Sequence, residues 1–247
     1  MPLGSGFWKY YNSPLDSFWC CTGTGVEEFA KFADSIYFHD DGGIFVNLFI
    51  PSELNWAEKG VHLRQETKFP EHEGTSLTIH SDRPVEMTLN IRVPYWATRG
   101  GAVKLNGAAL PAFSSPSSYL SIYRTWKDGD KVEVSLPMSL HIHPMPDDPT
   151  LQAMMYGPLV LAARLGDKGL TDALTYPKYD TAPAGEQIPV SAVINPSKVA
   201  TGWAEPVAGT PLNFRTTGQD EAMNFIPLYK VSGERYAVYL KVGAKAL

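Results

Sequence analysis

Apolar and polar residues alternate through most of this chain, and a period of two predicts β-strands. Two such runs, separated by the turn Asp40-Asp41-Gly42-Gly43, predict a hairpin over residues 35–50. More strands are expected at 61–67, 76–80, 85–93, 102–105, 119–123 and 131–136, with turns that include Asn106-Gly107 and Lys127-Asp128-Gly129-Asp130. Short strands at this spacing favour a β-sandwich. A longer apolar run at 151–163 predicts one buried strand that returns to the sheet.

Only one stretch has a clear helical period. Apolar residues recur every three or four positions between residues 26 and 36, which predicts a helix of about three turns. Glu27 and Glu28 are expected in its first turn, where the helix macrodipole favours acidic side chains. We interpret these two glutamates as partners of the dipole rather than as catalytic acids.

The fold class is therefore mostly β, a β-sandwich with one short N-terminal helix. Residues 1–36 hold an aromatic, turn-rich segment and the helix, and residues 37–165 hold the sandwich. From residue 166 the composition shifts to Pro, Ala, Gly, Thr and Asp. This shift predicts that residues 166–247 form either a looser second β unit or an excursion that returns to the first sandwich.

Composition excludes some classes of function. The chain has 247 residues and a formal net charge of -5, and it has no cluster of basic residues, so a nucleic-acid partner is not expected. No apolar run approaches the roughly 18 residues that a membrane span needs. We expect a soluble protein without a membrane partner and with no visible signal peptide, in a compartment that composition leaves unknown.

Cys20 and Cys21 are the only two cysteines, and they are adjacent. Two cysteines in so long a chain are no disulfide framework, and neighbours can join only through a strained ring. We interpret them as reduced thiols or metal ligands just ahead of the predicted helix, whose N-terminus would stabilise a thiolate. Buried inert thiols and a redox or metal-sensing pair are the alternatives.

Several segments of the chain are similar to one family of enzymes. The similarity is carried by Asp16-Ser17-Phe18-Trp19-Cys20-Cys21-Thr22-Gly23-Thr24-Gly25, Asp34-Ser35-Ile36-Tyr37-Phe38, Asn90-Ile91-Arg92-Val93-Pro94-Tyr95-Trp96, Tyr156-Gly157-Pro158-Leu159-Val160-Leu161 and Glu234-Arg235-Tyr236-Ala237-Val238-Tyr239. On these motifs the sequence resembles glycoside hydrolase family 127 and its relative family 146, the β-L-arabinofuranosidase-type enzymes. The resemblance covers nearly the whole chain.

The resemblance implies a retaining glycosidase with a zinc-bound cysteine nucleophile. Cys20 then corresponds to the nucleophilic zinc ligand, Cys21 to a neighbouring ligand, and the helix at 26–36 to the last helix of a catalytic (α/α)6 barrel. The other zinc ligands and the acid/base glutamate would come from the barrel upstream, which this sequence lacks. Val26-Glu27-Glu28-Phe29 also departs from the Met-Glu-Asn-His of many members. We therefore expect half of a site, with weak or no activity alone.

A second source of metal ligands lies in the sandwich region. His141 and His143 are two residues apart on a strand-like run, so both would point to one face. A polar strand edge explains this spacing equally well. We favour that structural interpretation because nothing in the sequence connects the pair to Cys20.

Two functional hypotheses follow. The first is a glycosidase of the family named above, acting on a plant-type, arabinose-containing glycan and assisted by a homo-oligomer or a separate barrel chain. The second is a non-catalytic β-sandwich module that binds a glycan or docks a partner. Its stacking residues would be exposed tryptophans, although core packing is the commoner role of such large side chains. The candidates are Trp56, Trp96, Trp126 and Trp203.

Overall fold

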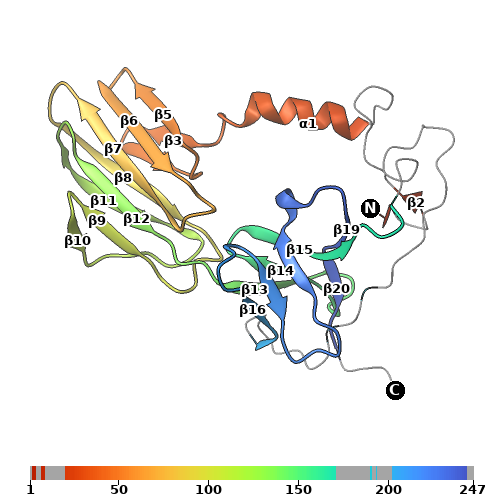
Figure 1. Cartoon of the computed structure of the whole chain (residues 1–247). Coiled ribbons are helices and arrows are strands. Elements are labelled where there is room, and N and C mark those ends of the chain that lie inside the picture. Colours follow the sequence, from red (N-terminus) through yellow and green to blue (C-terminus); the bar gives the residue numbers. More distant parts are fainter. Residues whose placement is uncertain are drawn as a thin grey trace. The chain divides into compact units, whose positions relative to one another are not determined.

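The computed structural model describes residues 2–3, 7–8, 20–170, 190, 193 and 202–243 (Figure 1). This part of the chain is mostly β and contains one short α-helix, as the alternation predicts. It divides into two compact units, which are described separately. The first consists of Lys31–Leu140 and Tyr156–Leu159, and the second includes His141–Met155 and the described residues from Val160 onward.

The helix α1 spans Cys20–Lys31, so the predicted bounds of 26–36 are wrong at both ends. Gly23 and Gly25 lower the helix propensity of the first turns by about 1 kcal/mol each, yet the helix continues through them because propensity is a weak constraint. At the other end, the carbonyl of Ile36 accepts hydrogen bonds from the N–H groups of Asn47 and Leu48 at 2.9 and 3.2 Å. Ile36 therefore belongs to the following hairpin.

The strands of the first unit form one six-stranded and one four-stranded sheet. The six-stranded sheet has the order β10-β9-β12-β7-β6-β5, and the four-stranded sheet has the order β11-β8-β4-β3. A separate two-stranded ribbon joins β1 (Pro2–Leu3) to β2 (Phe7–Trp8). The strand bounds in the two sheets are β3 (Tyr37–Asp40), β4 (Gly43–Val46), β5 (Ser52–Trp56), β6 (Val61–Thr67), β7 (Gly74–Ser81), β8 (Val85–Val93), β9 (Ala102–Leu105), β10 (Ala108–Leu110), β11 (Ser118–Trp126) and β12 (Lys131–Ser135).

A single hydrophobic cluster joins the two sheets of the first unit. Every second residue of β6, β7, β8 and β12 is buried in it, which is the pattern of strands with one face on a core. Trp126 is fully buried, and its indole N–H donates to the carbonyl of Met87 at 3.0 Å. The predicted β-sandwich is confirmed.

The predicted hairpin at 35–50 is confirmed as β3 and β4, which pair Tyr37 with Val46. Its turn is held by the Asp40 carboxylate, which accepts from the backbone N–H groups of Gly42 and Gly43 at 2.8 and 2.9 Å. Strand β4 then pairs with β8 in parallel, an arrangement that the alternation did not predict. Gly43 permits this close pairing, because a Cβ there would collide with the carbonyl of Thr88.

The amide of Gln65 on β6 is the most connected buried polar group of the first unit. Its side chain is 2% exposed, and its Nε2 donates to the carbonyls of Leu48 and Ile50 at 3.0 and 2.9 Å and to the Tyr37 hydroxyl at 3.2 Å. Its Oε1 accepts from the hydroxyl of Thr75 at 3.1 Å. One side chain therefore joins β6 and β7 of one sheet to the segment that leaves β4 of the other.

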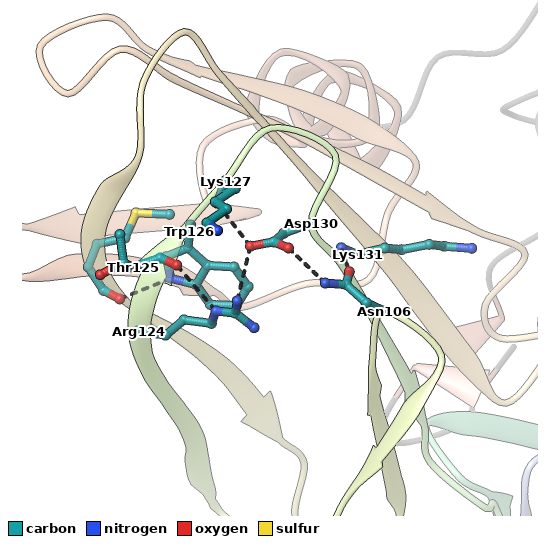
Figure 2. Close-up of polar contacts among 8 residues, drawn as sticks. Asn106, Arg124, Thr125, Trp126, Lys127, Asp130 and Lys131 are labelled. Atoms are coloured by element: carbon teal, nitrogen blue, oxygen red, sulfur yellow. Dashed lines mark hydrogen bonds and ion pairs between the residues drawn. The ribbon is translucent and has the colours of Figure 1, made fainter.

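The carboxylate of Asp130 joins two turns at the other end of the sandwich (Figure 2). It accepts from the Asn106 amide at 2.7 Å and from the Lys127 backbone N–H at 2.9 Å, and it lies 3.5 Å from the Arg124 guanidinium. Arg124 also lies over the ring of Trp126 at 5.3 Å. Burial by itself raises the pKa of Asp130, but these hydrogen bonds and the nearby positive charges outweigh it and hold that pKa below its usual value.

The second unit contains an eight-stranded sheet. Its main path is β13-β14-β15-β18-β17-β16, with β19 paired to β15 and β20 to β14. The single strand predicted at 151–163 is wrong, because a turn at Gly157, where φ is +53°, divides the run into β14 and β15. The bounds are β13 (Leu140–Pro144), β14 (Leu151–Tyr156), β15 (Leu159–Gly166), β16 (Ala204–Pro206), β17 (Phe214–Thr216), β18 (Asn224–Pro227), β19 (Arg235–Ala237) and β20 (Tyr239–Lys241), with a 3-10 helix at Leu228–Lys230.

Strands β14 and β15 pair with strands that come much later in the sequence. Both strands lie in the region that we grouped with the sandwich, and both pair with strands from beyond residue 223. The predicted boundaries at residues 36 and 165 stay a prediction about domains.

Replacing Gln65 by Met is expected to destabilise the first unit by about 2 to 4 kcal/mol, because the Leu48 carbonyl loses its Gln65 donor and the buried Thr75 hydroxyl loses its acceptor. Urea denaturation followed by tryptophan fluorescence measures the loss. Glu66→Gln on the same strand, which removes only an exposed ion pair with Arg64, is the matched control and should change stability by less than about 0.5 kcal/mol. Equal effects of the two variants would contradict a structural role for the amide.

Asp130 is expected to make the stability of the first unit depend on pH. Its pKa is lowered in the folded state, so its contribution is present above the ordinary pKa of 3.8 and is lost as the pH falls through the lower, folded value. Urea midpoints between pH 6 and pH 3 measure this. Asp130→Asn should flatten the acid decline, whereas Asp82→Asn, at an exposed site between β7 and β8, should not. A decline of the same steepness in Asp130→Asn would contradict the prediction.

Candidate functional site

Cys20 and Cys21 are the first two residues of α1. The N–H groups of the first turn of a helix have no partner within the helix, and the macrodipole places partial positive charge there, so this backbone position favours a thiolate. The structure describes the backbone of both residues, while their side chains lie outside the described part. Their roles as nucleophile and metal ligands stay predictions.

Zinc requires about four ligands, and a catalytic site takes three of them from the protein. Among the side chains that the structure describes, no three His, Cys, Asp or Glu residues are grouped so that they could hold a metal ion. Two adjacent thiols supply only half of the zinc coordination shell. The described side chains therefore do not make up a complete zinc centre, and no reaction step through zinc is derived from them.

Glu27 and Glu28 do not lie in the first turn of α1, as the sequence predicts, because the helix begins six residues before the predicted start. Both are exposed. The macrodipole falls off within the first turn, so the proposed dipole partnership is wrong. The apolar residues of the same helix are also exposed: Val26 and Phe29 have 65% and 75% of their surface accessible.

His141 and His143 lie on β13. His141 is half-buried and makes contacts with its surroundings, and His143 is exposed. Within the described residues the pair gathers no third metal ligand. The interpretation of this pair as a polar strand edge stays a prediction.

The four tryptophans proposed as stacking residues are buried. None of Trp56, Trp96, Trp126 and Trp203 has more than 6% of its surface exposed. Core packing is therefore their role, and a sugar ring cannot reach their faces. The exposed aromatic residues of the first unit include Tyr119 and Tyr123 instead, which sequence reasoning treated only as part of a strand. Their spacing could have indicated this exposure. With a period of two, both tyrosines lie on the face of the strand opposite Leu120.

The motif Tyr156-Gly157-Pro158 is structural. It forms the turn after β14, and the Tyr156 hydroxyl donates to Glu73 at 2.9 Å. The same Glu73 oxygen accepts from the backbone N–H of Met138 at 3.0 Å. Burial, followed by the hydrogen bond to Glu73 and its negative charge, raises the pKa of Tyr156 to about 12, with Arg99 opposing. A Cβ at Gly157 would collide with Met138, which explains the glycine.

Comparisons with known proteins give separate matches for the two halves of the chain. Residues 43–138 match the family model described as "Beta-L-arabinofuranosidase, GH127 middle domain". This chain carries a GH127 middle domain. Residues 141–242 match DUF4986, a domain of unknown function. A comparison with curated proteins gives no match.

Solved structures agree with this assignment at the level of the fold. A structure titled "Glycoside hydrolase" aligns over 98% of this chain with a TM-score of 0.64 and 18% identity. A GH127 β-L-arabinofuranosidase from Geobacillus stearothermophilus aligns over 91% with a TM-score of 0.63 and 20% identity. Another GH127 β-arabinofuranosidase aligns over 94% with a TM-score of 0.61 and 21% identity.

The chain spans less than half of each matched structure. It covers 43%, 37% and 40% of their lengths, in the same order. The GH127 middle domain corresponds to most of the first compact unit, and the DUF4986 match falls in the second. Among the described residues, no helix is long and apolar enough to cross a membrane.

Glu73→Gln is expected to lower the pKa of Tyr156 from about 12 towards 10, because the negative charge beside the phenol is removed. In the unmodified protein the linked stability is present in full below pH 10 and is lost as the pH rises through about 12. Alkaline titration by tyrosinate absorbance, with Tyr156→Phe to identify the signal, measures the shift. An unchanged pKa in Glu73→Gln would mean that burial alone is responsible.

Proposed function

We propose that this chain is the C-terminal part of a GH127-type glycoside hydrolase that cleaves β-L-arabinofuranosidic bonds with retention. One observation carries the proposal: the match to a GH127 middle domain, which begins at residue 43, comes next in the sequence after a helix that starts with Cys20 and Cys21 and ends at Lys31. A thiolate is a strong nucleophile towards a carbon centre, and a helix N-terminus favours the thiolate form. Cys20 is the proposed nucleophile.

Cys20 and Cys21 are proposed to provide two ligands of a zinc ion. The rest of the ligand set, and the carboxylic acid that protonates the leaving oxygen, would come from a catalytic barrel, either in the same polypeptide or in a separate chain. A second copy of the chain or a separate barrel chain would be the protein partner. We therefore expect the isolated chain to have weak or no activity on an arabinose-containing glycan.

A non-catalytic role in glycan binding is the alternative. The burial of the four tryptophans removes the residues on which sequence reasoning based it. The exposed tyrosines of β11 are the specific observation that keeps this alternative open.

Zinc titration against a colorimetric chelator tests the proposal at the cysteine pair. We expect weak binding that Cys20→Ser and Cys21→Ser each reduce at least tenfold, because half a shell loses one of its two thiolates. His143→Asn, on the other candidate pair, should leave binding unchanged. Zinc binding that survives both cysteine variants and is lost in His143→Asn would overturn the assignment of the ligands.

Hydrolysis of a chromogenic β-L-arabinofuranoside tests the expected inactivity. The isolated chain should release no more product than Cys20→Ser. Robust, zinc-dependent release that disappears in Cys20→Ser would contradict the expected inactivity, and would mean that a complete site assembles across an oligomer.

A further inference from the structure

The outer face of the four-stranded sheet combines exposed aromatic rings with hydrogen-bonding side chains. The core face of this sheet is made of Ile44, Leu89 and Leu120, which are almost fully buried. The residues between them point to the opposite side, because successive side chains of a strand alternate. We call this opposite side the tyrosine face; it comprises Phe38, Phe45, Glu86, Thr88, Asn90, Arg92, Tyr119, Ser121 and Tyr123.

The aromatic rings of the tyrosine face are exposed and yet held in place. Tyr119 is 37% exposed; its ring meets Phe45 edge to face at 5.4 Å, and its hydroxyl donates to the Asn47 side chain at 3.1 Å. Tyr123 is 68% exposed, and its hydroxyl donates to Glu86. Anchored rings lose little side-chain entropy when a ligand covers them. The two rings are thus prepared for stacking.

Polar groups lie between and beside the rings. In the register of β8 and β11, Arg92 lies opposite Tyr119, Asn90 opposite Ser121 and Thr88 opposite Tyr123. Ser121 donates to the Asn90 side-chain oxygen at 2.6 Å, which leaves the Ser121 oxygen as an acceptor at the surface. A ligand on this face therefore meets rings for stacking and both donors and acceptors.

This combination fits a sugar chain better than the other ligands that bind exposed aromatics. A sugar ring presents C–H groups on its face and hydroxyl groups around its edge, which match an aromatic ring with polar neighbours. A nucleic acid needs a positive groove, whereas Glu86 balances Arg92 on this face and the chain has a net charge of -5. A protein interface has an apolar centre depleted of charge, but here polar side chains lie between the rings.

The spacing of the tyrosines sets the size of the ligand. Tyr119 and Tyr123 are four residues apart on β11, so their Cα atoms are about 13 Å apart at the rise of a strand. One monosaccharide cannot contact both rings. A surface hollow of about 370 Å³ beside Ser52 and Arg64 involves none of these rings. The ligand must therefore lie along the flat face.

We propose that the tyrosine face binds an extended, neutral oligosaccharide, with Tyr119 and Tyr123 stacking on two of its sugar units. This site lies on the middle domain and requires neither cysteine. It goes beyond the proposed hydrolytic function and does not depend on it.

Isothermal titration and affinity electrophoresis of the full chain with soluble arabinan, and with a neutral glucan for comparison, test the site. Tyr123→Ala and Tyr119→Ala should each weaken binding about threefold to tenfold, the contribution expected of one ring contact. Tyr123→Phe keeps the ring and should bind within about twofold of the unmodified chain, since stacking on the ring rather than the hydroxyl provides the contact. Tyr229→Ala removes an equally exposed tyrosine of the other unit and should have no effect.

Three results would overturn the proposal. The first is that the unmodified chain binds neither polysaccharide. The second is that binding survives in the double variant of Tyr119 and Tyr123. The third is that the unmodified chain forms a dimer and that Tyr123→Ala converts it to a monomer. The last would identify the face as a protein interface. Circular dichroism of each variant shows that it is folded. Cys20→Ser should bind glycan normally, so a failure here leaves the hydrolytic proposal to its own experiments.

Discussion

The first unit depends on a buried side-chain amide. Apolar side chains in a sandwich core can exchange neighbours at modest cost, but a hydrogen bond fixes both the identity and the position of its partners. Gln65 uses both its oxygen and its nitrogen within the core, so the chain can leave β4 along only one path. The position of Tyr37 follows, because its hydroxyl lies between Gln65 and Ser52. The four-stranded sheet is thereby held against the six-stranded one.

The tyrosine face is the outer side of this four-stranded sheet. Strand β8 buries Leu89 and Ile91 on its core side and presents Glu86 and Arg92 on its other side, so one alternating sequence serves both the core and the surface. The cysteine pair, in contrast to the tyrosine face, does not belong to a sheet. It lies on an exposed helix with two glycines near its start, and the described residues offer it no further ligand. The hydrolytic proposal therefore depends on residues beyond the described ones, whereas the glycan-binding proposal depends only on the middle domain.

Much of the sandwich could be predicted from the sequence. The runs at 61–67, 85–93 and 102–105 coincide with β6, β8 and β9, because a strand with one buried face must alternate. The helix bounds could not be predicted, since Gly23 and Gly25 lower local propensity but do not decide the outcome. The parallel pairing of β4 with β8 could not be predicted from the sequence either. Alternation indicates which face of a strand is buried, but it does not indicate which strand lies beside it. The double-cysteine motif indicated the family correctly, whereas no pattern in the sequence identifies further metal ligands to accompany the cysteine pair.

The pairing of β3 with β4 has a practical consequence for producing the middle domain alone. The family match begins at residue 43, within this hairpin, so a domain cut there would lose β3 and the Asp40 side chain that closes the turn. Strand β4 would then have an open edge, which invites pairing between molecules and aggregation. Tyr37, a hydrogen-bond partner of Gln65, would be lost in the same cut. An expression boundary for this domain has to lie upstream of Tyr37, so the unit that folds is longer than the unit that sequence comparison recognises.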